Sequence, residues 1–371
     1  MDAVLITIIG AGVVGQAIAA GLANSRRDIV VLEKNAATGQ ETSSRNSEVV
    51  HAGLHYPPNS LKSVLCIEGN GLIYGLFERG LFKAKKLGKL IIATDPNEVL
   101  ALQGIHKNAL AAGVADLELL DGDGARRLEP ALKAVAALYS PNTGIVDSHG
   151  LMEYLAAKAR NGGAKLVTNS AVDLLEKTTG GFIVGINGGE YRFHSRIVIN
   201  AAGLYADRVA ALAGIDISQA GLKLKWCKGD YFAYGKRSPV SRVVYPVPHR
   251  DAHVLGIHAT LDLGGRLRFG PDAEYVDTID YRIAPGEKEA FAEAAKKLIP
   301  SLEAEHFHPD TSGIRPRLQG PGEDFRDFVI AEESARGLPG LINLIGIESP
   351  GLTASLAIGN LVGRMVDDFC S

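Results

Sequence analysis

The fold is decided by the stretch Ala3–Gly15, which reads AVLITIIGAGVVG. Its first half is a β-branched apolar run, which predicts a buried strand over Ala3–Ile9. The apolar spacing that follows predicts a helix over Val13–Asn24, and Asp28–Glu33 (DIVVLE) reads as a second strand. These three segments together predict a compact βαβ unit with its glycines at the turn between strand and helix.

Each glycine of this turn has a separate role. Gly10 permits the tight turn, Gly12 lets a pyrophosphate approach the main chain, and Gly15 lets the helix pack closely on the strand. The free amides and the positive end of the helix then attract the anion. Glu33 ends the second strand, where a carboxylate accepts hydrogen bonds from ribose hydroxyls and repels a 2′-phosphate. The pattern therefore predicts a dinucleotide site and disfavours NADP; a glycine-rich turn without a ligand is the alternative.

Two later segments favour FAD as the dinucleotide. After residues 43–47 (SSRNS) the chain does not continue through the regular βα repeats of a nicotinamide-binding domain. Residues 345–355 (IGIESPGLTAS) offer a second glycine turn at a helix N-terminus, whose amides can stabilise the negative pyrimidine edge of a reduced flavin. A simple left-handed turn at Gly351 is the alternative.

The middle of the chain predicts a second domain. Short alternating stretches at 230–234, 243–247 and 267–270 are separated by proline and glycine, which is typical of an antiparallel sheet. We therefore expect an α/β fold (α+β overall) in which a discontinuous Rossmann-like FAD-binding domain carries an antiparallel-sheet substrate domain. The FAD-binding domain is expected over residues 1–85, 145–220 and 312–371, and the substrate-binding domain over residues 86–144 and 221–311.

Composition excludes several classes of function. The net charge of −3 over 371 residues gives no indication of a nucleic-acid partner. The three cysteines are scattered and form no CxxC pair, which argues against a metal site and favours reduced thiols in the cytoplasm. The apolar N-terminal run lacks the basic start of a signal peptide and contains too many glycines for a membrane span. The basic run 83–89 is expected to be a solvated surface, which could dock on an acceptor protein or peripherally on the inner face of a membrane.

These motifs resemble the D-amino-acid-oxidase superfamily of FAD-dependent oxidoreductases, and within it the L-2-hydroxyglutarate dehydrogenase/oxidase family. The resemblance spans nearly the whole chain in order, from the glycine turn and Glu33 through residues 42–53 (TSSRNSEVVHAG), 200–203 (NAAG), 313–316 (GIRP) and 349–355 (SPGLTAS). It implies a substrate domain packed over the flavin and oxidation of an L-2-hydroxy acid to the 2-oxo acid by hydride transfer.

The resemblance also implies which residues contact the cofactor. Those expected at the ADP part are Gly10, Gly12, Val13, Val14, Gly15, Glu33, Lys34 and, through its main chain, Val172. Those expected along the pyrophosphate, the ribityl chain and the nucleotide are Ser43, Ser44, Arg45, Asn46, Ser47, Ala201, Ala202 and Gly203. Those expected around the isoalloxazine are Arg315, Gly346, Gly351, Leu352 and Thr353. The sequence departs from the family pattern at Glu48, Ala52 and His55, where the family has glycine, serine and tyrosine, and these departures leave the identity of the substrate open.

Alcohol oxidation by hydride transfer needs a base for the hydroxyl proton and a cation for the carboxylate. His51 is the expected base, because an imidazole titrates near neutral pH and this one matches the family motif. His55 lies in the same loop and is the second candidate for a catalytic role, although it could bind substrate instead; a structural role in the loop is the alternative for both histidines. Arg315 is expected to grip the carboxylate with its planar guanidinium, and the alternative is a surface arginine.

Other residues of the substrate domain are weaker candidates for substrate binding. They are Lys228, Asp230, Tyr231, His249 and His258, for which a solvated strand face is the alternative. A dicarboxylic substrate would need a second cation, which Lys228 or Arg250 could supply.

Three functions compete on this sequence. The first is an FAD-dependent oxidase or dehydrogenase of a small L-2-hydroxy acid, with oxygen, a quinone or a carrier protein as electron acceptor. The second is an amine-oxidising relative that acts on glycine or sarcosine with the same carboxylate clamp. The third is a non-catalytic nucleotide-binding scaffold, against which the pair of Arg315 and His51 argues.

Overall fold

The computed structural model describes residues 1–24, 27–248, 256–284 and 286–371, and the chain divides into two compact units. Unit 1 comprises Met1–Ser44, Ser148–Trp226 and Arg315–Ser371, and unit 2 comprises Arg45–Asp147 and Cys227–Ile314. Residues 45–85, 145–147 and 312–314 thus lie in unit 2, and residues 221–226 lie in unit 1, whereas the sequence interpretation groups each of these segments with the other domain. Strand pairing explains the difference for the first two segments, because β3 (Val49–Val50), β4 (Ala84–Lys86) and β8 (Gly144–Val146) pair with one another in a small sheet of unit 2.

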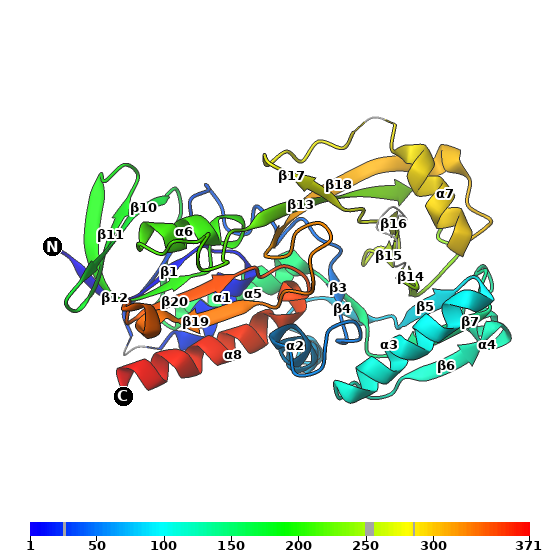
Figure 1. The fold of residues 1–371 in the computed structure, drawn as a ribbon, viewed down its shortest axis with the longest axis horizontal. Coiled ribbons are helices and arrows are strands. Elements are labelled where there is room, and N and C mark those ends of the chain that lie inside the picture. Colours follow the sequence, from blue (N-terminus) through cyan, green and yellow to red (C-terminus); the bar gives the residue numbers. More distant parts are fainter. Residues whose placement is uncertain (25–26, 249–255, 285) are drawn as a thin grey trace. The chain divides into compact units, whose positions relative to one another are not determined.

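Unit 1 is built on an eight-stranded sheet whose centre is parallel (Figure 1). The parallel strands lie in the order β20, β12, β1, β2, β9. A hairpin of β10 and β11 extends the sheet beside the first half of β12, and β19 pairs antiparallel with β20. The bounds are β1 Ala3–Ile9, β2 Ile29–Leu32, β9 Lys165–Val167, β10 Val172–Thr178, β11 Gly181–Ile186, β12 Tyr191–Asn200, β19 Val329–Glu332 and β20 Leu341–Ile345.

Helices cover both faces of this sheet (Figure 1). On one face α6 packs over Ile9, Val198 and Leu341, which alternate with side chains that point to the other face. On that other face α1 packs against both α5 and α8. Gly359 of α8 lies so close to α1 that an added Cβ would sit 2.9 Å from the Ala17 carbonyl oxygen, so the chain's last helix rests directly on its first. The helices are α1 Val13–Leu22, α5 Ser148–Asn161, α6 Ala206–Leu212 and α8 Gly351–Cys370, with short 3₁₀ turns η2 Gly203–Tyr205 and η4 Glu333–Arg336.

Unit 2 is built on a nine-stranded sheet in the order β17, β13, β16, β15, β14, β5, β7, β6, with β18 beside β13. The expected antiparallel pairing is present in five neighbouring pairs. The pair of β14 and β5 is parallel, because β5 comes from a separate, earlier segment of the chain. The bounds are β5 Lys89–Ala93, β6 Glu118–Asp121, β7 Ala136–Ser140, β13 Lys225–Tyr234, β14 Val243–Pro246, β15 Ala259–Leu261, β16 Leu267–Phe269, β17 Glu274–Val276 and β18 Phe307–Arg317.

Two apolar layers cover the two faces of this second sheet. Leu90 and Ile92 of β5 belong to the layer that includes α7, and Ile91 and Ala93 belong to the layer that includes α3. Since side chains alternate along a strand, Lys89 lies on the same face as Ile91. The helices of this unit are α2 Leu61–Glu78, α3 Val99–Ala111, α4 Gly122–Leu128 and α7 Lys288–Leu298, with 3₁₀ turns η1 Pro96–Glu98 and η3 Ala304–His306.

The basic run 83–89 differs from the expectation at its last residue. Lys83, Lys85 and Lys86 are exposed as expected, but the side chain of Lys89 has no accessible surface. It is the first residue of β5, which has β14 on one side and β7 on the other, so the strand carries the side chain into the interior of unit 2. Within the described residues, the helices are too short or too polar for any of them to cross a membrane.

Candidate functional site

The glycine turn of unit 1 has the close packing that the sequence predicts. Gly10 follows β1 with a φ of +102°, a conformation that favours glycine, and an added Cβ would clash with the Ala201 carbonyl. A Cβ on Gly15 would clash with the Gly10 carbonyl, so α1 lies directly against the turn. At Gly12 a Cβ would lie 2.8 Å from the Ser43 Oγ, which accepts a 2.9 Å hydrogen bond from the Val13 amide. Ser43 thus lies at the N-terminus of α1, and any side chain at Gly12 would occupy the space beside its hydroxyl.

Glu33 is fixed by the main chain at the end of β2. It is 7% exposed, and its two carboxylate oxygens accept hydrogen bonds from the amides of Ala11 (3.0 Å) and Asn35 (2.9 Å). Each carboxylate oxygen has a second lone pair, which a ribose hydroxyl can use. The neighbouring Lys34 turns away to Glu41, with 2.7 Å between the ammonium nitrogen and Oε1.

The remaining residues expected at the cofactor lie mainly at one edge of the parallel sheet. Gly10 follows β1, Glu33 follows β2, residues 201–203 follow β12, and Gly346 follows β20, all at the carboxyl ends of their strands. Val172 begins β10, two residues after Ser170, whose amide donates a hydrogen bond to the Glu33 carbonyl at 2.8 Å. Ligands of open α/β sheets bind at this edge, so the donors present fit a dinucleotide.

A second helix begins at the same edge. The left-handed residue of this turn is Gly346, with a φ of +75°, whereas Gly351 is the first residue of α8. The first turn of α8 contains no acidic residue, and Thr353 within it is fully buried. Its N-terminal amides and dipole therefore favour negative charge, as the sequence interpretation of this segment expects.

In unit 2, His51 directly follows β3 in a loop that two asparagines hold. The Asn70 amide of α2 donates to the His51 carbonyl at 2.9 Å. The Asn108 amide of α3 donates to the carbonyls of Leu54 (3.1 Å) and Tyr56 (2.9 Å). Both asparagines are functional candidates that the sequence interpretation misses, because an asparagine inside a helix gives no signal of what its side chain contacts.

The imidazole of His51 is neutral at physiological pH. Burial, assisted by the positive charge of Lys89, lowers the pKa of His51 to about 3. His55 keeps accessible surface, yet its pKa lies well below the ordinary value. The largest cause is burial of its ring, and electrostatic interaction with Lys89 is the next. A neutral imidazole carries one nitrogen without a proton, and that nitrogen is the atom that acts as a base.

Lys89, whose positive charge acts on both histidines, is another residue that the sequence interpretation misses as a functional candidate. Burial lowers the pKa of the Lys89 amine from 10.5 to about 8. Its Nζ lies 4.6 Å from the centre of the Tyr245 ring, and that ring stacks on His258 at 3.5 Å and an interplanar angle of 1°. Side chains alternate along β5, so Lys89 lies on the same buried face as Ile91. This alternation is present in the sequence, but the exposed lysines just before it make Lys89 look like part of a solvated surface.

Two of the segments that carry the family resemblance, residues 42–53 and residues 313–316, contact each other within unit 2 through Arg45 and Gly313. A Cβ on Gly313 would clash with the carbonyl of Arg45, so this position of the GIRP segment must stay small. The Arg45 guanidinium lies 4.1 Å from the centre of the Tyr281 ring, a cation–π distance. Asn46 accepts a 2.8 Å hydrogen bond from the amide of Glu48, the residue that departs from the family's glycine, and Glu48 has a left-handed φ of 57°.

Arg315 belongs to unit 1, while His51 and His55 belong to unit 2. Arg315 is half-buried near the end of β18, so it is not a fully exposed surface arginine. The neighbouring Arg317 pairs with Glu348, with 3.3 Å between Nε and Oε1. The two arginines of the segment therefore differ, and Arg317 has a structural partner within unit 1.

Lys228 is a poor choice for a second substrate cation. Its ammonium lies 3.1 Å from the Asp230 carboxylate and donates to the Arg282 carbonyl at 2.5 Å, and both charged side chains are buried. Burial raises the pKa of Asp230 despite this pairing. Tyr231 is buried with the Arg268 guanidinium 5.2 Å from its ring centre. His249 and Arg250 lie outside the described residues.

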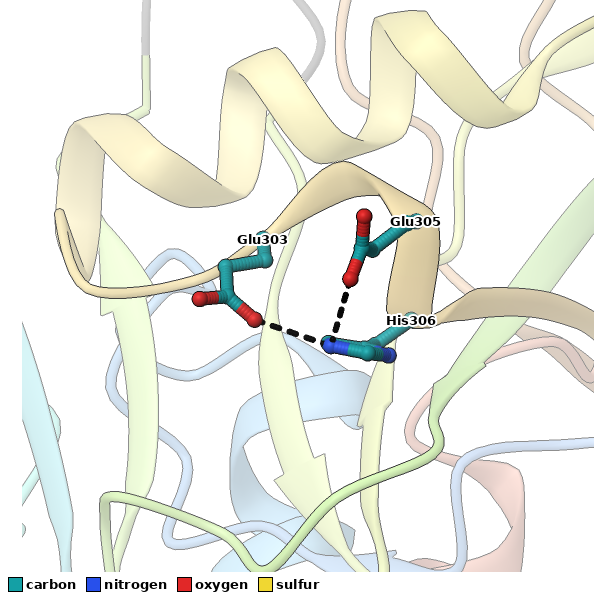
Figure 2. A group of neighbouring side chains, drawn as sticks. All are labelled: Glu303, Glu305 and His306. Atoms are coloured by element: carbon teal, nitrogen blue, oxygen red, sulfur yellow. Dashed lines mark ion pairs between the residues drawn. The ribbon is translucent and has the colours of Figure 1, made fainter.

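One group of possible metal ligands occurs in unit 2, although the sequence predicts no metal. Figure 2 shows Glu303, Glu305 and His306 with ion pairs of 2.8 Å and 3.2 Å from the His306 Nε2 to the two carboxylates. Glu303 also pairs with Lys236 at 2.9 Å. This is an exposed ion-pair network, a common feature of protein surfaces.

Comparisons with known proteins agree with this geometry. A family model described as FAD dependent oxidoreductase matches residues 6–365. The chain is 38% identical to the mitochondrial L-2-hydroxyglutarate dehydrogenase of Arabidopsis thaliana, over 96% of this chain and 82% of that protein.

Solved structures give the same picture. An L-α-glycerophosphate oxidase from Mycoplasma pneumoniae with FAD bound matches with a TM-score of 0.87 and 26% identity, over 99% of this chain and 95% of that one. A glycine oxidase from Geobacillus kaustophilus matches with a TM-score of 0.80 and 23% identity, over 99% and 95%, and this likeness concerns the fold. The glycine turn, the fixed Glu33 and a family match over nearly the whole length lead to one conclusion: the chain belongs to the FAD-dependent oxidoreductases.

Proposed function

We propose that this protein oxidises L-2-hydroxyglutarate to 2-oxoglutarate with FAD as cofactor. The observation that carries the proposal is the 38% identity to a plant L-2-hydroxyglutarate dehydrogenase over 96% of the chain. An enzyme of the same fold that oxidises an amine, such as glycine oxidase, shares less of the sequence. The alcohol-oxidising activity is therefore the better supported of the two.

The cofactor site of this proposal is the carboxyl edge of the sheet in unit 1. The amides at the N-terminus of α1, next to Gly12 and Ser43, would bind the pyrophosphate, and Glu33 would accept hydrogen bonds from the adenosine ribose. The amides at the start of α8, around Gly351, would border the flavin ring. FAD, when bound, supplies the acceptor for the hydride that leaves C2 of the substrate.

The chain's own groups would then handle the carboxylate and the proton. The Arg315 guanidinium would bind the C1 carboxylate with two parallel hydrogen bonds, which fixes the orientation of C2. The neutral His51 imidazole would take the proton from the C2 hydroxyl as the hydride leaves. Its low pKa keeps the lone pair available over the whole physiological range, although it also limits the strength of the base.

The departures from the family pattern concern the loop that carries the histidines. His55 stands where the family has a tyrosine, and its exposed, neutral imidazole can donate a hydrogen bond to the substrate or accept one from it.

For the electron acceptor, oxygen, a quinone and a carrier protein remain candidates. We propose the cytoplasm as the compartment, in keeping with three free thiols, although the plant relative is named mitochondrial.

The test is anaerobic mixing of the purified holoprotein with L-2-hydroxyglutarate while the flavin absorbance is recorded. Bleaching of the spectrum and formation of 2-oxoglutarate support the proposal. A spectrum that stays oxidised with this acid but bleaches with glycine or sarcosine would replace it with the amine-oxidising function. Reoxidation of the bleached protein with air, a soluble quinone or a carrier protein then separates the three acceptors by rate.

A further inference from the structure

The most unusual group outside the roles assigned so far is the amine of Lys89. Its side chain has no accessible surface, and its Nζ has no hydrogen-bond partner among the residues that the structure describes. No carboxylate of those residues pairs with it, and burial lowers the pKa of its amine to about 8. Burial of a lone ammonium is strongly unfavourable unless an anion compensates it. A protein that keeps such a group has a use for its charge.

The surroundings of Lys89 indicate where that anion would come from. The amine interacts electrostatically with His51 and His55, which follow β3 in one loop, and its Nζ lies 4.6 Å from the centre of the Tyr245 ring, on which His258 stacks. Both loop histidines are held neutral, so Lys89 is the positive charge of this group. His55 has accessible surface, so the loop beside this group is partly open to solvent.

We propose that Lys89 is the specificity-determining residue that binds the distal, C5 carboxylate of a dicarboxylic 2-hydroxy acid. The inference rests on the proposed function, because it adds a second carboxylate site to the one assigned to Arg315. It also replaces Lys228, whose charge Asp230 already neutralises at 3.1 Å. A dicarboxylate would pair its second carboxylate with the Lys89 ammonium. A bound monocarboxylate would leave this buried ammonium without a counter-ion, so the site would bind the monocarboxylate less tightly.

The experiment compares Lys89→Met with the wild-type holoprotein, because methionine keeps the length of the side chain and removes the charge. Lys86→Met is the matched control, since Lys86 is exposed on β4 nearby in the sequence. Binding is measured with glutarate, a dicarboxylate that lacks the reacting hydroxyl, by its effect on the flavin spectrum and on Tm. Turnover is measured with L-2-hydroxyglutarate and with L-2-hydroxypentanoate, which has the same carbon chain and no distal carboxylate.

Lys89→Met should weaken glutarate binding and raise KM for L-2-hydroxyglutarate by roughly 10- to 100-fold, as expected for a lost charge-assisted hydrogen bond. Its KM for L-2-hydroxypentanoate should stay within about twofold of the wild-type value. Flavin content should be unchanged and Tm should not fall, because the variant removes an uncompensated buried charge. Lys86→Met should behave as the wild type throughout.

A pH series gives an independent readout. Glutarate affinity should fall as pH rises through about 8, because the protonated amine is the binding form, and this dependence should disappear in Lys89→Met. The pKa values of His51, about 3, and Cys66, about 12, lie outside this window, and burial raises the pKa of Tyr245 beyond it. His55 and His258 are common to both proteins, so the comparison isolates Lys89.

An equal rise in KM for both hydroxy acids in Lys89→Met would overturn the assignment. Equal affinity of the wild type and Lys89→Met for glutarate would overturn it as well. A wild-type protein that binds glutarate through Lys89 but is not reduced by L-2-hydroxyglutarate would refute the proposed oxidation and leave the carboxylate site standing. The two hypotheses therefore fail in different measurements.

Discussion

At the scale of single residues, the charge of Lys89 should be visible in the pH dependence of stability. The pKa of its amine is about 8 in the folded protein and 10.5 ordinarily, so between these values the unfolded chain binds more protons. The free energy of unfolding of the wild type should therefore rise with pH across this window, by about 3 kcal/mol in total. Below pH 8 that amount is missing from the wild type, because its folded state carries the buried charge.

Lys89→Met should consequently be more stable than the wild type by up to about 3 kcal/mol at pH 7, and the difference should shrink as pH approaches 10.5. Urea unfolding of both proteins at several pH values measures it. A difference that stays constant with pH would mean that the amine is already neutral, or compensated, at pH 7.

Backbone strain at Glu48 gives a second prediction for a single residue. Its φ of 57° is left-handed, which costs a residue with a side chain about 1–2 kcal/mol relative to glycine. Replacement by glycine would remove this strain, but part of the stability gained would be lost again, because glycine loses more conformational entropy on folding. Glu48→Gly should therefore raise the free energy of unfolding by about 0.5–1 kcal/mol. Asn59, at a φ of 65°, is a control: Asn59→Gly should change stability less, because asparagine tolerates this conformation. A destabilised Glu48→Gly would show that the side chain contributes more than the strain costs.

At the scale of elements, the loop that carries His51 and His55 depends on α2 and α3. Asn108→Ala removes two hydrogen bonds to the carbonyls of Leu54 and Tyr56, which should loosen the loop between them. We expect slower anaerobic flavin reduction, by roughly tenfold, because proton transfer requires a fixed geometry. FAD affinity should change less than this rate, because most of the residues assigned to the cofactor lie in unit 1. Gln103→Ala, an exposed change on the same helix, is the control, and stopped-flow absorbance measures the rate. An unchanged rate would mean that the loop is fixed without Asn108.

The elements themselves were predictable where a local pattern determines them. The first strand has the predicted bounds, Ala3–Ile9, because a buried parallel strand is a continuous apolar run. The hairpin of β10 and β11 was missed, since its outer strand alternates weakly and packs only one face. The parallel pair of β14 and β5 could not be predicted, because strand pairing between distant segments leaves no local signal. For the same reason the grouping of Lys89 with His51, His55 and Tyr245 emerged only from the fold.

At the scale of the whole molecule, unit 1 is assembled from three separate chain segments, while unit 2 has apolar layers of its own on both faces of its sheet. All three segments of unit 1 bring residues to the proposed cofactor edge: Gly10 and Glu33, then Gly203, then Gly346. A ligand that contacts all three would hold them together. Removal of FAD should therefore destabilise unit 1 much more than unit 2.

The expected size of this effect follows from mass action. With FAD at about 100 times its Kd, binding adds about 2.7 kcal/mol to the stability of the unit that binds it. Amide hydrogen exchange in β1, β12 and β20 should then accelerate roughly 100-fold in the apoprotein, while exchange in β5 and β7 should change little. Glu33→Ala provides the matched variant: at the same FAD concentration it should show part of the acceleration, because the ribose loses its acceptor. Uniform acceleration across both units would show instead that the molecule unfolds as one cooperative body, in which the cofactor stabilises the substrate sheet as strongly as its own.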